Sequence, residues 1–123
     1  MKKRIAALVV EDEPLLRFDL TQALEADGCK TFEASDSTEA IAVLEAHLEI
    51  RVVFTDVQMP GSMDGLALSH YVRERWPNTF IVVSSGRCSP SKDEMACDAL
   101  FLAKPYMPGV IAEVLRDIRQ QVG

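Results

Sequence analysis

Reactive side chains follow four separate strand-forming runs of this 123-residue sequence. In chain order these side chains are the pair Glu11 and Asp12, then Asp56, then Ser84, and finally Lys104. The carboxyl ends of parallel strands meet at one edge of a sheet, and ligands bind at that edge. If the four runs lie parallel in one sheet, we expect three carboxylates, a hydroxyl and an ammonium to come together there.

Such a group of acids favours a bound metal ion. Three neighbouring carboxylates repel one another unless a cation joins them. Oxygen ligands without His or Cys favour Mg²⁺ or Mn²⁺. The ligand candidates are Glu11, Asp12 and Asp56, and the backbone carbonyl of Gln58 can complete the protein's share.

A carboxylate beside such an ion can also attack phosphorus and form an aspartyl phosphate. The transferred group then needs positive charge and hydrogen-bond donors around its oxygens. We expect Asp56 to be the nucleophile, Lys104 to supply the charge and Ser84 to supply the hydroxyl. A cis peptide between Lys104 and Pro105 would direct the ammonium into the site, although X–Pro bonds are more often trans.

Each residue also has a purely structural interpretation. The acids at 11–13 could favour a helix amino terminus, Asp56 could cap a turn, and Lys104 could be a solvated charge at a strand end. Ser84 could be an ordinary turn residue, and Ser85 competes for its role. The functional interpretation therefore rests on four strand ends showing the required chemistry together.

Composition narrows the class of protein. With 48% hydrophobic and 26% charged residues, the sequence predicts one globular domain over 1–123 with no output domain. The net charge of −6 argues against direct binding to nucleic acid or anionic membranes. The amino terminus does not resemble a signal peptide, and no apolar run approaches the roughly 20 residues of a membrane span. We expect a cytoplasmic protein with protein or small-ion partners.

Short apolar runs alternate with amphipathic stretches along the whole chain, which indicates consecutive βα units. The predicted strands are 5–10, 30–34, 51–55, 80–83 and 100–103, with the second at an edge. A helix is expected after each strand, and the fourth, within 87–98, should be short and mobile. Five strands and five helices predict an α/β fold of the flavodoxin-like type, a doubly wound parallel sheet in a three-layer sandwich.

Two helices have specific sequence signals. Asp64 is a suitable N-cap for the third helix. In the first helix, an apolar stripe of helical period is expected to face the core, and it consists of Leu15, Leu16, Phe18, Leu20 and Leu24.

The cysteines and histidines carry little functional signal. Three cysteines without a CxxC spacing indicate neither a disulfide framework nor a zinc site. Reduced thiols are expected, and a redox-sensing pair of Cys88 and Cys97 is the alternative. His47 and His70 are expected on helix surfaces with no catalytic role.

The sequence resembles a response-regulator receiver domain of the chemotaxis-regulator type, a module that accepts a phosphoryl group from a sensor histidine kinase. The matching segments are 8–13, 52–60, 63–65, 82–86 and 101–105. The resemblance implies that Asp56 is the phosphoacceptor and that Glu11 and Asp12 belong to the metal-binding acidic pair. It also implies that Ser84 is the switch hydroxyl, Lys104 the phosphate-binding lysine and Phe101 the switch aromatic.

Four features depart from the family pattern. Ser84 stands where Thr is common, and Phe101 stands where Tyr is frequent. The residues Gly61 and Ser62 make the loop after Asp56 one residue longer than usual. The short helix expected within 87–98 puts the usual output face of the family in question.

The resemblance implies a two-state switch in two-component signalling rather than an enzyme. The domain would assist its own phosphorylation and dephosphorylation, receiving phosphate from a histidine kinase or a histidine phosphotransfer protein. A downstream protein target, or a phosphorylation-dependent homodimer, would provide the output. A diffusible regulator and a phosphorelay intermediate are both compatible with the sequence.

Three other functions are less compatible with the sequence. An aspartyl phosphohydrolase usually carries a second acid two residues after its nucleophile, where this chain has Gln58. A flavin-binding electron carrier would need a phosphate-binding loop where this chain has acids. A scaffold that is never phosphorylated would have no use for the full set of site residues.

Overall fold

The computed structural model describes residues 4–59, 61, 63–87 and 89–122. The strands in this part of the chain are β1 (Ala6–Val10), β2 (Lys30–Ala34), β3 (Ile50–Asp56), β4 (Phe80–Ser85) and β5 (Leu100–Ala103). The helices are α1 (Pro14–Ala26), α2 (Ser37–Ala46), α3 (Gly65–Arg75) and α4 (Pro108–Val122).

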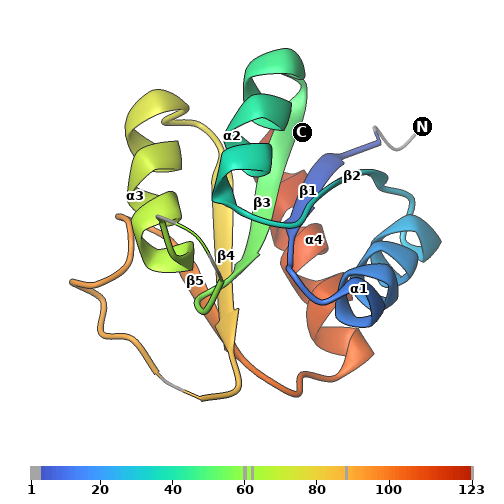
Figure 1. Ribbon diagram of the computed structural model, residues 1–123. Coiled ribbons are helices and arrows are strands. Elements are labelled where there is room, and N and C mark those ends of the chain that lie inside the picture. Colours follow the sequence, from blue (N-terminus) through green and yellow to red (C-terminus); the bar gives the residue numbers. More distant parts are fainter. Residues whose placement is uncertain (1–3, 60, 62, 88, 123) are drawn as a thin grey trace.

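All five strands run parallel in one sheet with the order β2-β1-β3-β4-β5 (Figure 1). The predicted α/β class, the five strands and the edge position of β2 are therefore confirmed. The register pairs Val10 with Thr55 and Asp56 with Ser84. Because of this register, the carboxyl ends of β1, β3 and β4 lie beside one another.

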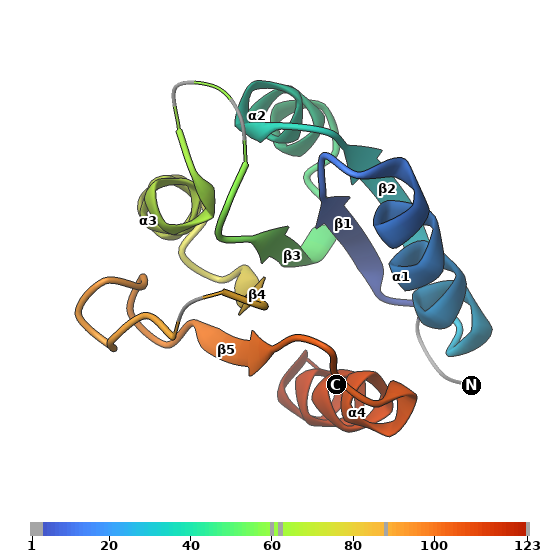
Figure 2. The same ribbon diagram turned by 60° about the horizontal axis from the view of Figure 1, so that its bottom comes forward.

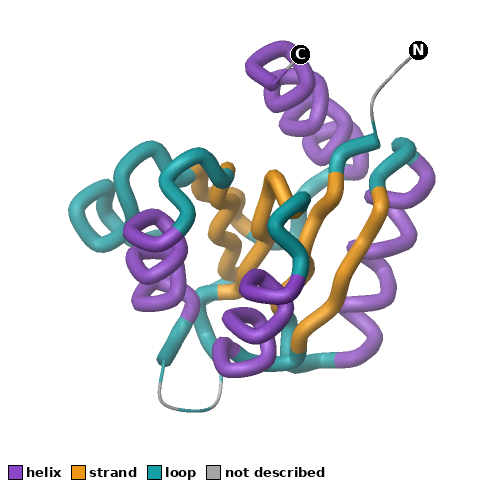
Figure 3. The backbone as a smooth tube through the Cα atoms, turned by 90° about the horizontal axis from the view of Figure 1, so that it is seen from above, coloured by secondary structure: helices purple, strands orange, loops and turns teal. Residues whose placement is uncertain are grey.

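Helices cover both faces of the sheet. Helices α1 and α4 lie on one face and α2 and α3 on the other (Figure 2), so the strands form the middle layer (Figure 3). Alternate residues of each strand point to opposite faces. In β1, Leu8 and Val10 join the core under α2 and α3, whereas Val9 joins the core under α1 and α4.

The helix termini follow the local sequence signals. Asp64 is the N-cap of α3, where its side chain accepts a hydrogen bond of 2.9 Å from the backbone N–H of Ala67. Asp36 is the N-cap of α2, and its side chain accepts a hydrogen bond of 2.8 Å from the backbone N–H of Glu39. Pro14 occupies the first turn of α1, where its missing N–H costs nothing.

The predicted buried stripe of α1 is wrong over its first half. Leu15 is 72% exposed, Leu16 43% and Phe18 57%, whereas Leu24 is completely buried. The helical period determines which residues share a face, but the neighbouring layers determine how much of that face is covered. Here only the second half of the stripe, around Leu20 and Leu24, packs against the core that α1 shares with α4.

The predicted helix within 87–98 is also wrong, because the described residues of this region form turns. The 89–99 segment lies beside α3 and is held by that helix's side chains. Ser69 Oγ accepts from the N–H of Ala96 at 3.2 Å. His70 Nε2 lies 2.9 Å from the carbonyl of Glu94, and Arg73 Nε donates to the carbonyl of Cys97 at 2.9 Å.

Apolar burial completes the anchoring of the 89–99 segment. Met95 and Ala96 are buried in the core under α2 and α3. These two side chains and the hydrogen bonds from α3 fix the segment without helical backbone bonds. In the described part of the chain, no helix combines the length and apolar character needed to cross a membrane.

The two edge strands differ in chemistry. Strand β2 has the sequence KTFEA and carries the charged residues Lys30 and Glu33. Strand β5 has the sequence LFLA, which contains no charged residue, and its first residue, Leu100, is exposed. Charged side chains on an edge strand discourage pairing with another chain, so only β2 has this protection.

Candidate functional site

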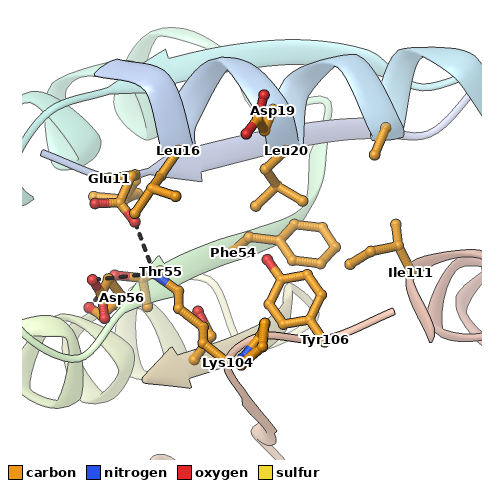
Figure 4. A pocket seen from close by; sticks show the side chains of 14 residues that line it. Glu11, Leu16, Asp19, Leu20, Phe54, Thr55, Asp56, Lys104, Tyr106 and Ile111 are labelled. Atoms are coloured by element: carbon orange, nitrogen blue, oxygen red, sulfur yellow. Dashed lines mark hydrogen bonds and ion pairs between the residues drawn. The ribbon is translucent and has the colours of Figure 1, made fainter. Parts of the chain in front are cut away.

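The predicted convergence of strand ends is present in the structure. Lys104, directly after β5, extends its ammonium between the carboxylates that follow β1 and end β3 (Figure 4). Its Nζ lies 3.0 Å from Glu11 Oε1 and 3.3 Å from Asp56 Oδ2. The three side chains are largely buried, so the ion pairs are poorly screened by solvent.

Glu11 is the most buried of the acids. Its Oε2 also accepts a hydrogen bond of 3.1 Å from the N–H of Glu13. Burial raises the pKa of Glu11, and the hydrogen bonds from Lys104 and Glu13 only partly offset that increase. Burial on its own would lower the pKa of Lys104, but Glu11 and Asp56 outweigh it and raise that pKa.

Three carboxylates lie close enough together to hold a metal ion. One oxygen each from Glu11, Asp12 and Asp56 lies within 4.8 Å of the others. Asp12 is exposed to solvent, which leaves one side of this group accessible to a hydrated ion. An oxygen-only ligand set of this kind fits Mg²⁺ or Mn²⁺. The part assigned to the carbonyl of Gln58 stays a prediction.

Ser84 and Ser85 are distinguished by their places on β4. Ser84 is paired with Asp56 in the register of the sheet and lines the same groove as Asp56 and Lys104. Ser85 points to the other face, and its hydroxyl oxygen accepts from the N–H of Arg87 at 3.1 Å. The structure therefore places Ser84 beside the acids, as the strand-end argument expected.

Next to the acids, a groove of about 370 Å³ extends between α1 and α4. Its polar end contains Glu11, Asp56, Ser84 and Lys104, and its apolar walls come from Leu16, Leu20, Phe54 and Ile111 (Figure 4). Tyr106, which the sequence interpretation missed, forms another wall. Burial raises the pKa of its phenol. The sequence signal that could have identified Tyr106 is its position two residues after Lys104.

The peptide bond between Lys104 and Pro105 is cis.

Gly65 lies in the matching segment 63–65, but the sequence interpretation gave it no structural role. It begins α3, and a Cβ built on it would overlap the backbone carbonyl of Asp56. Its N–H donates to the carbonyl of Val57 at 2.8 Å. The start of α3 therefore packs directly on the backbone that carries the candidate nucleophile, and only a residue without a side chain fits there.

The sequence as a whole matches a known family. A profile of the response regulator receiver domain matches residues 7–116. The chain belongs to that family. The receiver domain is a signalling module of two-component systems.

Curated relatives of this receiver domain are response regulators. The aerobic respiration control protein ArcA of Escherichia coli is 32% identical over 105 residues, which cover 82% of this chain and 42% of ArcA. Response regulator Rre1 of Synechocystis is 32% identical over 130 residues, covering 98% of this chain and 55% of Rre1. The chain thus spans about half the length of these relatives.

Solved structures show the same fold. Chemotaxis protein CheY4 of Vibrio cholerae superposes with a TM-score of 0.82 and 25% identity, covering 94% of this chain and 99% of that one. A response regulator receiver protein of Sinorhizobium medicae gives a TM-score of 0.86 at 24% identity, covering 96% of each chain. The flavodoxin-like fold of the receiver domain is therefore confirmed.

Phe101, which stands where Tyr is frequent in the family, can be placed in the structure. Phe101, in register with Val83, is half-buried against the core under α2 and α3. The longer loop after Asp56 includes Ser62, which lies outside the described residues. The roles of Phe101 and Ser84 in switching stay predictions.

The groove beside Glu11 and Asp56 is lined by none of the described cysteines and histidines. Cys29 is buried and Cys97 is exposed, and both are free thiols, while Cys88 lies outside the described residues. The proposed pair of Cys88 and Cys97 is therefore untested. His47 follows α2, and its ring lies 4.4 Å from that of Phe32 at a tilt of 37°. His70 lies exposed on α3.

Proposed function

We propose that this receiver domain accepts a phosphoryl group on Asp56 from a histidine kinase or a histidine phosphotransfer protein. The observation that supports this most is the position of Lys104, whose ammonium lies within 3.3 Å of Asp56 and within 3.0 Å of Glu11. A cation fixed at the nucleophile can stabilise the charge on a transferred phosphoryl group.

In the proposed step, a carboxylate oxygen of Asp56 attacks the phosphorus of a phosphohistidine. An O–P bond forms and the P–N bond breaks, and the bonding electrons return to the imidazole nitrogen. The product is an acyl phosphate on Asp56. Lys104 and Ser84, which line the same groove, would hold the phosphoryl oxygens by an ion pair and a hydrogen bond.

Glu11, Asp12, Asp56 and the carbonyl of Gln58 would hold Mg²⁺ or Mn²⁺. The bound ion would supply positive charge that offsets the repulsion between the acids and the phosphoryl oxygens. The three carboxylates support this proposal because their oxygens lie close together without a His or Cys among them.

The phosphorylated state would change the surface that a partner recognises. Ser84 lies on β4 and Phe101 on β5, and the connection between these two strands includes the 89–99 segment. A movement of Ser84 towards a phosphoryl group would pull on this connection and allow Phe101 to rotate. A downstream protein, or a second copy, would then bind one state better than the other. On this proposal the domain is a cytoplasmic signalling protein and not an enzyme.

Phosphorylation by a small-molecule donor tests the proposal directly. The protein is incubated with acetyl phosphate and Mg²⁺, and its intact mass is measured. We expect an adduct of about 80 Da, the mass of one added phosphoryl unit, on the wild type and none on Asp56→Asn. The matched control is Asp36→Asn, because Asn also serves as an N-cap and should leave labelling unchanged. Equal labelling of wild type and Asp56→Asn would reject Asp56 as the phosphoacceptor.

A further inference from the structure

Arg17 links the loop that carries two of the acids to a neighbouring strand. From the first half of α1, its Nη1 donates a hydrogen bond of 2.8 Å to the backbone carbonyl of Glu11. Its Nε donates to Glu33 Oε1 on β2 at 3.0 Å. The side chain of Arg17 is only 21% exposed, so most of it is buried against the protein surface.

This contact holds the backbone carbonyl of Glu11 in place. The N–H of Glu11 donates to the carbonyl of Ala34 at 3.0 Å, and its carboxylate accepts from Glu13 and Lys104. Within the described part of the chain, its carbonyl receives its side-chain hydrogen bond from Arg17. Arg17 therefore controls the backbone direction at the point where the chain leaves β1 and places Glu11 and Asp12.

We infer that Arg17 is a positioning residue for the divalent-metal site, acting through the backbone of Glu11. This inference rests on the proposed metal site at Glu11, Asp12 and Asp56. Groups that orient metal ligands from outside typically change metal affinity by 10- to 100-fold when they are replaced. Arg17 suits this role because a planar guanidinium donates in two fixed directions at once, which the single ammonium of lysine cannot reproduce.

The direction in which Mg²⁺ affinity changes when Arg17 is replaced distinguishes a positioning role from an effect of its charge alone. A positive charge near the acids repels an incoming cation, so removing it should strengthen Mg²⁺ binding if charge alone matters. Positioning predicts the opposite for Arg17→Gln. It also predicts weaker binding for Arg17→Lys, which keeps the charge and loses the two-directional contact.

The test is isothermal titration of the full chain with Mg²⁺ alone. Arg17→Lys and Arg17→Gln should each weaken binding by about 10-fold relative to wild type. The matched control is Arg75→Lys, because Arg75 is also ion-paired with a carboxylate, Glu45, at 3.2 Å but lies on α3. That variant should bind Mg²⁺ as the wild type does. Unchanged affinity in Arg17→Lys, or tighter binding in Arg17→Gln, would overturn the inference.

A second measurement distinguishes local misplacement from general destabilisation. Hydrogen exchange, recorded well below the melting temperature of each variant, should accelerate at the amides of 11–13 in Arg17→Lys and not at those of β3. Equal acceleration in both regions would mean that Arg17 serves only overall stability. The outcome for the proposed function is separate, because it depends on whether acetyl phosphate labels the wild type and leaves Asp56→Asn unlabelled.

Discussion

Lys104 and Asp56 are 48 positions apart in the chain, yet the ammonium of one lies 3.3 Å from the carboxylate of the other. The same ammonium lies 3.0 Å from Glu11. Lys104 thus acts as an internal counterion for two largely buried acids, and its removal leaves them facing each other. Leaving a charged hydrogen-bonding group without its partner costs about 2 kcal/mol.

We therefore predict that Lys104→Gln lowers the free energy of unfolding by about 2 kcal/mol in the presence of EDTA. Saturating Mg²⁺ should restore more stability to this variant than to the wild type, because the ion replaces the missing charge. Urea denaturation with and without Mg²⁺ measures both effects. The control is Lys30→Gln, which removes an exposed ion pair with Glu49 and should change little.

Gly65→Ala should disturb the site from the backbone side. The added methyl would overlap the carbonyl of Asp56, so either α3 or the end of β3 must move. Overpacking of this kind costs about 2 kcal/mol, and we expect a loss of that size in the free energy of unfolding. Acetyl phosphate labelling should slow as well, since Asp56 shifts with its backbone.

Gly109→Ala provides the matched comparison for Gly65→Ala. A Cβ at Gly109 meets no atom within 4 Å, and the residue lies in the first turn of α4. We expect this variant to be about 0.5 kcal/mol more stable than the wild type, because alanine restricts the unfolded chain. A similar loss in both glycine variants would contradict the packing argument.

Arg73 should limit local unfolding of the 89–99 segment. Its guanidinium donates to the carbonyls of Cys97, Pro77 and Thr79, at 2.9, 3.0 and 2.6 Å. Arg73→Lys cannot satisfy all three, so hydrogen exchange in the segment should accelerate while exchange in β1 stays slow. Arg75→Lys, two positions along the same helix, should leave the segment unchanged.

Tyr106 should give the protein a distinct alkaline titration. Burial raises the pKa of its phenol above the usual 10.0, so the folded state holds that proton longer than the unfolded chain does. Stability should therefore fall as pH rises from 10.0 through the folded pKa. Tyr106→Phe should lack this part of the pH dependence, and the difference in phenolate absorbance between the two proteins isolates the titration. Ionisation of Tyr106 at or below pH 10.0 would disagree with its burial.

Much of the fold and the arrangement of the site could be predicted from the sequence because the signals are local. Each strand is an apolar run with a clear end, and Asp64 sits directly before the helix that it caps. Parallel strands necessarily bring their carboxyl ends to one edge, so Glu11, Asp56 and Ser84 could be placed together before any distance was known.

The features that could not be predicted depend on contacts between distant segments. The 89–99 segment looked like a short helix, but Ser69, His70 and Arg73 on α3 supply the hydrogen bonds that a helix would have made internally. Leu15 is exposed because it lies in the first turn of α1, where no neighbouring element in the described part of the chain covers the helix. Likewise, the steric requirement for Gly65 comes from the backbone of Asp56, which lies nine positions earlier in the chain.

The unequal edges of the sheet have a practical consequence for handling the protein. At the high concentrations used for spectroscopy, unwanted strand-to-strand association should start at β5 and spare β2, whose lysine and glutamate oppose it. Leu100 is the first residue of β5 and therefore lies at the end of the strand opposite the carboxylates. Leu100→Lys is the first substitution to make for a sample that stays monomeric at high concentration.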